Sequence, residues 1–110
     1  MSHNDGGPLL FGYMRVPDDM TDEEVQQKQA DMGAYAEVEG FTLTTVFHEF
    51  VNGGINVFSE MADAIQRAEA RHVIVPSYRD LALTRPLQDA MALHLEQTAG
   101  AQIVSLDERA

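Results

Sequence analysis

The sequence has no cysteine and no tryptophan, and Lys28 is its only lysine. Without cysteine the chain forms no disulfide, no thiolate nucleophile and no cysteine-ligated zinc site. It also lacks an apolar run near the roughly 18 residues that a membrane-spanning helix needs. The first eight residues are polar and carry neither the basic nor the apolar region of a signal peptide. These absences together predict a cytoplasmic protein with no membrane partner.

Positive charge is scarce as well, because 7 Lys and Arg residues face 18 Asp and Glu residues and leave a net charge of −11. Binding to nucleic acid depends largely on cationic side chains that displace counterions from phosphates. A small domain this acidic is repelled by phosphate, so direct DNA binding is not expected. Five acidic residues fall close together and are typical of a solvated helix N-terminus, where carboxylates suit the helix dipole: Asp18, Asp19, Asp22, Glu23 and Glu24.

With 110 residues, 45% of them hydrophobic, the chain has the size and composition of one globular domain. Apolar and β-branched runs predict four strands, and apolar residues at helical spacing between them predict three helices. Thr21 and Glu24 fit a capping box at the first helix, and Gly40 and Gly100 are placed to end the first and third. The strands are expected at 9–16, 41–50, 72–77 and 102–106. The helices are expected from Thr21 to Glu39, over Phe58 to Ala68, and over a third segment that is marked by Leu87 to Leu95 and ended by Gly100.

This βαβαβαβ order predicts an α/β fold, a three-layer sandwich built around a mainly parallel four-stranded sheet. Residues 1–8 are expected to form a flexible N-terminal tail, and residues 9–110 a single domain. In open sheets of this kind, ligands collect at the carboxyl ends of the strands. Any functional site is therefore expected at that edge of the sheet.

Common ligand motifs are absent from the sequence. There is no glycine-rich phosphate loop of the GxGxxG or GxxxxGK[ST] type. The four histidines, His3, His48, His72 and His94, are never spaced i,i+4, so neither a metal site nor a cofactor is predicted. Ser77 follows Pro76 at the end of a predicted strand and is assigned to a turn rather than to a nucleophile.

The end of the first predicted strand reads Tyr13-Met14-Arg15-Val16-Pro17. It resembles the opening of the serine recombinase (resolvase/invertase) N-terminal catalytic domain, which has Tyr-x-Arg-Val-Ser there. Further matches follow in the family's order: Gln29, Tyr35-Ala36, Gly40-Phe41, HVIVPSYRDLAL at 72–83 and GAQIVSLDE at 100–108. The resemblance covers roughly residues 9–108 and implies a resolvase-like fold.

The departures from this family pattern fall where its chemistry takes place. The resemblance implies a serine that attacks a DNA phosphate, but Pro17 stands at that position and has no hydroxyl. The family also surrounds the phosphate with arginines; Arg15 is kept, whereas Asn56-Val57-Phe58 stands where an Arg-Pro pair leads into the second helix. The family segment Leu-Asp-Arg-Leu-x-Arg, aligned on Leu81, becomes Arg79-Asp80-Leu81-Ala82-Leu83. We expect no catalytic residue and only a vestigial anion site of Arg15 and Arg79.

A recombinase-like scaffold without its reactive groups predicts a catalytically inactive module that regulates or binds other proteins. The expected partner is another protein or a second copy of the chain, as a dimer. An apolar stretch around the glycine loop is the expected contact surface: Phe50, Val51, Ile55, Val57 and Phe58. Two alternatives stay open, both using Arg15 and Arg79: a recombinase-type enzyme that acts on DNA through an altered site, and a sensor of small anions or nucleotides.

Overall fold

A computed structural model of the chain describes residues 7–50 and 54–109, and the side chains of this part as far as residue 107. Every predicted strand and helix is present, and the strand ends lie within two residues of the predicted ones. Two short 3-10 turns, η1 (Tyr78–Asp80) and η2 (Leu106–Arg109), were not predicted. The elements are β1 (Leu9–Arg15), α1 (Asp22–Glu39), β2 (Thr42–Glu49), α2 (Asn56–Ala68), β3 (His72–Val75), α3 (Arg85–Ala99) and β4 (Gln102–Ser105).

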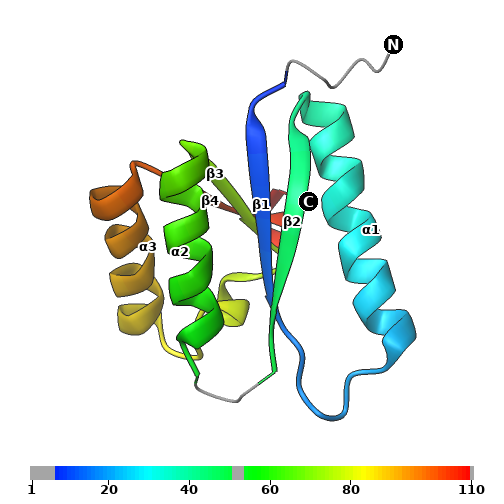
Figure 1. Cartoon of the computed structure of the whole chain (residues 1–110). Coiled ribbons are helices and arrows are strands. Elements are labelled where there is room, and N and C mark those ends of the chain that lie inside the picture. Colours follow the sequence, from blue (N-terminus) through cyan, green and yellow to red (C-terminus); the bar gives the residue numbers. More distant parts are fainter. Residues whose placement is uncertain (1–6, 51–53, 110) are drawn as a thin grey trace.

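The four strands form one sheet in the order β2-β1-β3-β4, and every neighbouring pair is parallel. Helix α1 covers one face of the sheet, and α2 and α3 cover the other (Figure 1). The predicted α/β three-layer sandwich is confirmed, with a sheet that is wholly rather than mainly parallel. Within the described residues no helix is long and apolar enough to cross a membrane.

Two separate cores lie on the two faces of the sheet, because β1 alternates its side chains between them. Leu10 and Met14 pack toward α1, together with Met32 and Ala36 of that helix. Phe11 and Tyr13 pack toward α2 and α3, where they meet the larger cluster. A strand that is apolar on both faces is typical of a parallel sheet covered by helices on both sides.

The predicted signals at the ends of α1 are present. The Thr21 amide donates to Glu24 Oε1 at 2.8 Å, and the Glu24 amide donates to Thr21 Oγ1 at 3.1 Å, which completes the capping box. Gly40 ends the helix in a left-handed conformation with φ of +80°. Gly100 ends α3 in the same way, with φ of +64°.

Two glycines allow a paired test of this packing. A Cβ on Gly12 would lie 3.0 Å from Val46 Cγ2 and 3.2 Å from Met32 Sδ, whereas a Cβ on Gly33 within α1 meets no atom of the described chain within 4 Å. Gly12→Ala is therefore expected to lower the free energy of unfolding by about 1 kcal/mol through overpacking. Gly33→Ala is expected to raise it by about 0.5–1 kcal/mol, because alanine favours a helix interior. Urea denaturation measures both, and shifts of the same sign would contradict this account.

Candidate functional site

The carboxyl ends of the strands lie at the lower end of the molecule in Figure 1. The connections from β1 and β3 leave in opposite directions, because the chain passes from β1 to one edge of the sheet and then returns to the other side. Such a switch point is where open α/β sheets bind ligands. Both predicted anion-site residues are here, Arg15 at the end of β1 and Arg79 in η1, which follows β3.

Arg15 is half-buried and joins three segments of the chain. Its amide donates to Asp80 Oδ2 at 3.0 Å. Its Nη2 atom donates to the carbonyl oxygens of Gly54 at 3.0 Å and Leu81 at 2.9 Å. The guanidinium therefore satisfies main-chain carbonyls of the loop before α2 and of the segment after η1. Most of this arrangement is a structural bridge, built from residues far apart in the sequence.

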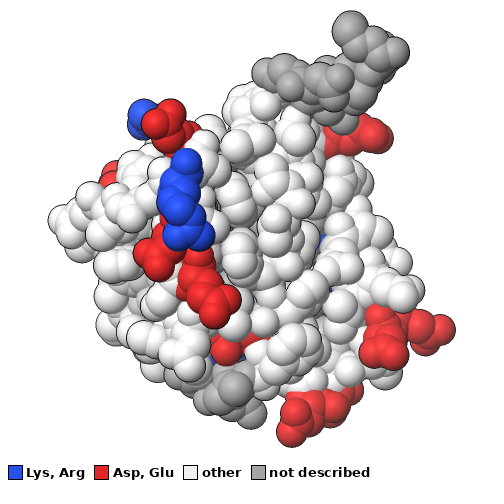
Figure 2. All heavy atoms as spheres, in the orientation of Figure 1, with Lys and Arg blue, Asp and Glu red and all other residues white. Residues whose placement is uncertain are grey.

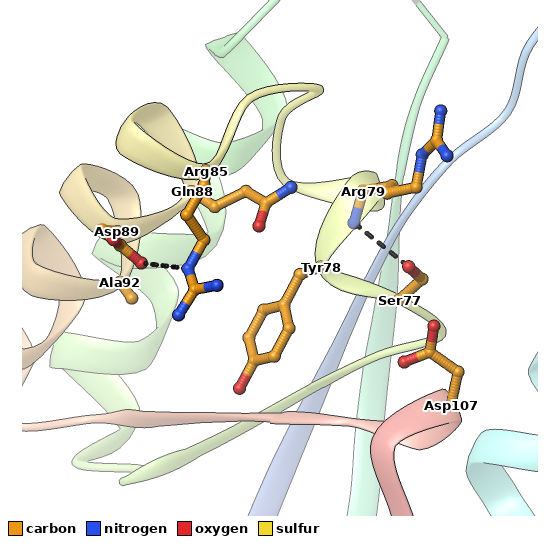
Figure 3. A pocket seen from close by; sticks show the side chains of 8 residues that line it. All are labelled: Ser77, Tyr78, Arg79, Arg85, Gln88, Asp89, Ala92 and Asp107. Carbon is orange, nitrogen blue, oxygen red and sulfur yellow. Dashed lines mark hydrogen bonds and ion pairs between the residues drawn. The ribbon is translucent and has the colours of Figure 1, made fainter.

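Arg79 has different surroundings, because its side chain is exposed. Its amide donates to Ser77 Oγ at 3.2 Å, so Ser77 caps the turn as predicted. In Figure 3 the Arg79 side chain extends away from Tyr78 and Arg85. The structure thus brings Arg15 and Arg79 to one edge of the sheet, but it buries only the first of the two guanidinium groups in part.

Two carboxylates lie at the same edge and were not predicted as site residues. Glu49, at the end of β2, is 3% exposed, and its Oε1 accepts the Val57 amide at 3.1 Å. It thereby caps the start of α2, since the preceding Ile55 has no polar side chain. Burial raises the pKa of Asp80, while hydrogen bonds from the Arg15 and Ser77 amides and the charges of Lys28 and Arg15 oppose that rise.

The Tyr13 side chain is fully buried beneath this edge, and its ring packs edge-to-face on Phe58 with centroids 5.5 Å apart. Its hydroxyl has no hydrogen-bond partner among the described residues. Burial raises the pKa of Tyr13 to about 12; the charges of Glu49 and Asp80 add to this effect and that of Arg15 opposes it. The charges of one arginine and two carboxylates therefore act on this buried hydroxyl.

Pro17 occupies the position at which the family resemblance implies a serine. It is half-buried, and its carbonyl accepts the Met20 amide at 3.0 Å, which closes a turn between β1 and α1. Its ring carries no oxygen that could attack a phosphate. Ser77, the other hydroxyl considered in the sequence, uses its Oγ to accept the Arg79 amide. Neither residue has the surroundings of an activated nucleophile.

The predicted contact surface is only partly present. Phe50 is 65% exposed and Ile55 is 54% exposed, as expected, and Val57 is half-buried against the core. Phe58 was predicted wrongly as a contact residue: it is 4% exposed because it packs on Tyr13 in the larger core. Val51 lies outside the described residues.

Two apolar residues beside this surface were missed. Leu83 is 79% exposed, just before α3, and Leu87 is 50% exposed in the first turn of that helix. Helical spacing predicts that Leu87, Met91 and Leu95 share one apolar stripe of this helix. Only Met91 and Leu95 of the three are buried, so Leu87 lies at the margin of the stripe. The apolar stripe of α3 is wider than the area that the sheet covers, and this width was the signal in the sequence for an exposed Leu87.

An open pocket of about 430 Å³ lies beyond η1, between the ends of β3 and β4 and the start of α3 (Figure 3). Arg85 forms an ion pair with Asp89, Nε to Oδ1 at 3.3 Å, and its side chain runs beside the Tyr78 ring. Both partners of the pair are largely exposed, so the pair contributes little to stability. The lining residues are Ser77, Tyr78, Arg79, Arg85, Gln88, Asp89, Ala92 and Asp107.

The described residues contain no group of three or more histidine, aspartate or glutamate side chains that could hold a metal ion. Among the described residues, His48 Nε2 and His72 Nδ1 are buried and have no hydrogen-bond partner. Burial lowers the pKa of His48. The two rings pack on aromatic neighbours instead, His48 on Phe50 and His72 on Phe41.

The family model described as "Resolvase, N terminal domain" matches residues 10–110. A search of curated proteins gave no match. Among solved structures, the C-terminal catalytic domain of ISC1926 TnpA, an IS607-like serine recombinase, superposes with a TM-score of 0.75 at 15% identity, over 89% of this chain and 69% of that one.

Two further structures are similar to the chain. The N-terminal catalytic domain of TP901-1 integrase gives a TM-score of 0.73 at 15% identity, with 91% of this chain and 78% of that chain covered. A resolvase family site-specific recombinase from Streptococcus pneumoniae gives 0.75 at 14% identity, with 92% and 73% covered. At these identities the likeness establishes the fold.

Proposed function

The chain belongs to the family of resolvase N-terminal domains, and from that premise we propose that it is a non-catalytic member that acts by binding proteins. The observation that carries this proposal is the identity and bonding of two residues at the end of β1. Pro17 stands where the family resemblance implies the attacking serine, and the Arg15 guanidinium is bonded to the main-chain carbonyls of Gly54 and Leu81. The chain thus keeps the family's scaffold, and Arg15, the arginine that it shares with the family motif, stabilises the fold.

Electrostatics support the loss of phosphodiester chemistry. Recombination by this family, as the resemblance implies, needs cations that stabilise charge on the reacting phosphate. In this chain Asp80 accepts the Arg15 amide, and Glu49 is the register neighbour of Arg15 on β2, so two carboxylates share this edge with Arg15. Two unit charges about 6 Å apart interact by roughly 2–3 kcal/mol at an effective dielectric constant near 20. Carboxylates at this edge therefore oppose the approach of a phosphate and offset the attraction that Arg15 would exert.

The binding half of the proposal is supported by exposed apolar surface at the same edge. Phe50 and Ile55 are exposed to solvent and flank the connection between β2 and α2. Exposed apolar residues that lie together on a surface are typical of protein contact sites, whereas single scattered ones are not. The net charge of −11 disfavours DNA as the partner. We propose a protein partner, with a second copy of the chain as the alternative occupant.

Restoring the missing hydroxyl tests the catalytic half. Pro17→Ser is expected to leave supercoiled plasmid uncut and to form no covalent protein–DNA ester, because the substitution supplies an oxygen but no cationic surroundings for the phosphate. Agarose gels detect nicking or cleavage, and mass spectrometry after nuclease digestion detects the ester. A purified active serine recombinase with its own plasmid serves as the positive control.

Pro17→Ala is the matched control for this variant, since it removes the ring without adding a hydroxyl. An ester formed by Pro17→Ser and not by Pro17→Ala would show that the site keeps its chemistry and would overturn the proposed loss of catalysis. An ester formed by the unaltered chain would overturn it as well, and would point to Ser77 or another residue as the nucleophile.

A further inference from the structure

Resting on the proposed function, the structure assigns a partner class to the apolar surface: we propose that it binds a basic, amphipathic segment of another protein. We call this surface the carboxyl-edge patch, formed by Phe50, Ile55, Leu83 and Leu87. Six large apolar residues of the described chain are half or more exposed, and these four are among them. The other two, Val38 and Leu93, lie away from the patch, near the end of α1 and in the second half of α3.

Hydrogen bonds hold the segments of the patch together. One atom, Arg15 Nη2, donates to the carbonyls of both Gly54 and Leu81, so the chain just before Ile55 lies beside the chain that leads into Leu83. Helices α2 and α3 also start at this end of the molecule (Figure 1). Through Arg15, the segments that carry Ile55 and Leu83 are therefore tied together, which lowers the ordering cost of binding.

An acidic run lies at the same end of the molecule as the patch, where β1 leads into α1 on the other face of the sheet, and we treat it as the rim of the patch on that side. The Val16 amide donates to the Glu49 carbonyl at 2.9 Å, so the chain that continues into the acidic run passes beside the chain that continues into Phe50. Acidic groups lie at this lower end of the molecule in Figure 2. The members of the run are all exposed: Asp18, Asp19, Asp22, Glu23 and Glu24.

Few cations offset this rim. Arg79 and Arg85 are exposed near the patch, but Arg85 is paired with Asp89. The balance at the rim is therefore negative. An apolar centre with a charged rim is the common design of a protein interface, and the sign of the rim selects the partner. A second copy would bring one acidic rim toward another, in molecules that each carry −11, and this repulsion disfavours self-association.

The apolar residues fit a helical partner. Leu83 lies just before α3 and Leu87 in its first turn, and Phe50 and Ile55 flank the connection between β2 and α2. An amphipathic helix that lays leucines at i, i+3, i+4 and i+7 on such a surface would hold Lys and Arg on its flanks within reach of the acidic run. The charge pattern and the apolar patch thus call for the same kind of segment.

A defined probe tests the inference: a fluorescein-labelled peptide of about 18 leucines and lysines in an amphipathic helical pattern, added to the full chain and followed by anisotropy. The double variant Leu83→Ser/Leu87→Ser is expected to weaken binding about tenfold, because two apolar contacts are lost. The matched double variant Val38→Ser/Leu93→Ser, which alters residues of 80% and 50% exposure away from the patch, is expected to change it less than about twofold.

Charge is tested separately. Asp18→Asn/Asp19→Asn is expected to weaken binding about threefold at low salt, and this effect is expected to disappear near 0.5 M salt because of screening. The same peptide with glutamate in place of lysine is expected to bind at least about tenfold more weakly. Circular dichroism confirms that the variants remain folded, which their exposed positions lead us to expect.

Three results would overturn the inference. The first is equal weakening of binding by Leu83→Ser/Leu87→Ser and by Val38→Ser/Leu93→Ser, and the second is equal binding of the lysine and glutamate peptides. The third is a dimer of the free chain, seen in sedimentation, that Leu83→Ser/Leu87→Ser dissociates. The dimer would show that a second copy covers the patch. None of these results concerns DNA chemistry, so the inference can fail while Pro17→Ser stays inert. A trapped protein–DNA ester, in turn, would contradict the proposed loss of catalysis, whether or not the peptide binds.

Discussion

Arg15→Ala is expected to lower the free energy of unfolding by about 3 kcal/mol, since hydrogen bonds to a charged group contribute about 1.5–3 kcal/mol and the carbonyls left behind are partly buried. The substitution removes the donor that joins the loop before α2 to the segment after η1, through Gly54 and Leu81. The bond from the Arg15 amide to Asp80 belongs to the main chain and would remain. Urea denaturation at neutral pH measures the change.

Arg79→Ala is the matched control, because it removes an exposed arginine from the same edge of the sheet. It is expected to change the free energy of unfolding by less than about 0.5 kcal/mol. If the two substitutions had equal and small effects, the structural bridge assigned to Arg15 would be wrong. The residue would then be available for a ligand, and the proposal that its guanidinium serves the fold would be withdrawn.

Tyr13→Phe is expected to raise the free energy of unfolding by about 1–2 kcal/mol, because a buried hydroxyl without a partner costs about that much and phenylalanine keeps the ring. The hydroxyl is fully buried and unpaired among the described residues, and the ring contact with Phe58 does not depend on it. Tyr78→Phe is the matched control, since Tyr78 is half-buried at an open pocket. Its effect is expected to be near zero.

The pH dependence of stability provides a second test of Tyr13. The pKa of this hydroxyl is about 12 in the folded chain, against 10.0 for an unperturbed tyrosine. Between these values the unfolded chain loses the proton while the folded chain keeps it, so stability falls as pH rises from about 10 toward 12. Tyr13→Phe is expected to remove that part of the decline. A variant that declines as steeply as the unaltered chain would show that Tyr13 is not the group responsible.

These two residues illustrate how the family scaffold is kept while its site changes. Arg15 retains the identity that the resemblance implies, yet its contacts are with main-chain carbonyls. Tyr13 also matches the resemblance, yet it is buried next to Glu49 and Asp80. The match of individual residues to a motif therefore says less about chemistry here than the charges that surround them.

The order of strands and helices, the caps of α1 and the two-sided core of β1 could all be predicted from the amino-acid sequence. These features depend on local physics: Thr21 bonds to Glu24 three residues away, Gly40 adopts a conformation that most residues avoid, and apolar runs report burial on both faces. The absence of a hydroxyl at Pro17 and the net charge of −11 also follow directly from the amino-acid sequence.

The set of side chains that meet at the carboxyl edge could not be predicted in this way, because it depends on contacts between distant segments. Arg15 bonds to residues 65, 39 and 66 positions away, and no local pattern reports such partners. The exposure of Leu83 and Leu87 and the burial of Phe58 depend on how far each helix is covered by the sheet and by its neighbour. The candidate interface emerged there because helix periodicity specifies a stripe of apolar residues, while packing between distant segments determines which part of that stripe is covered.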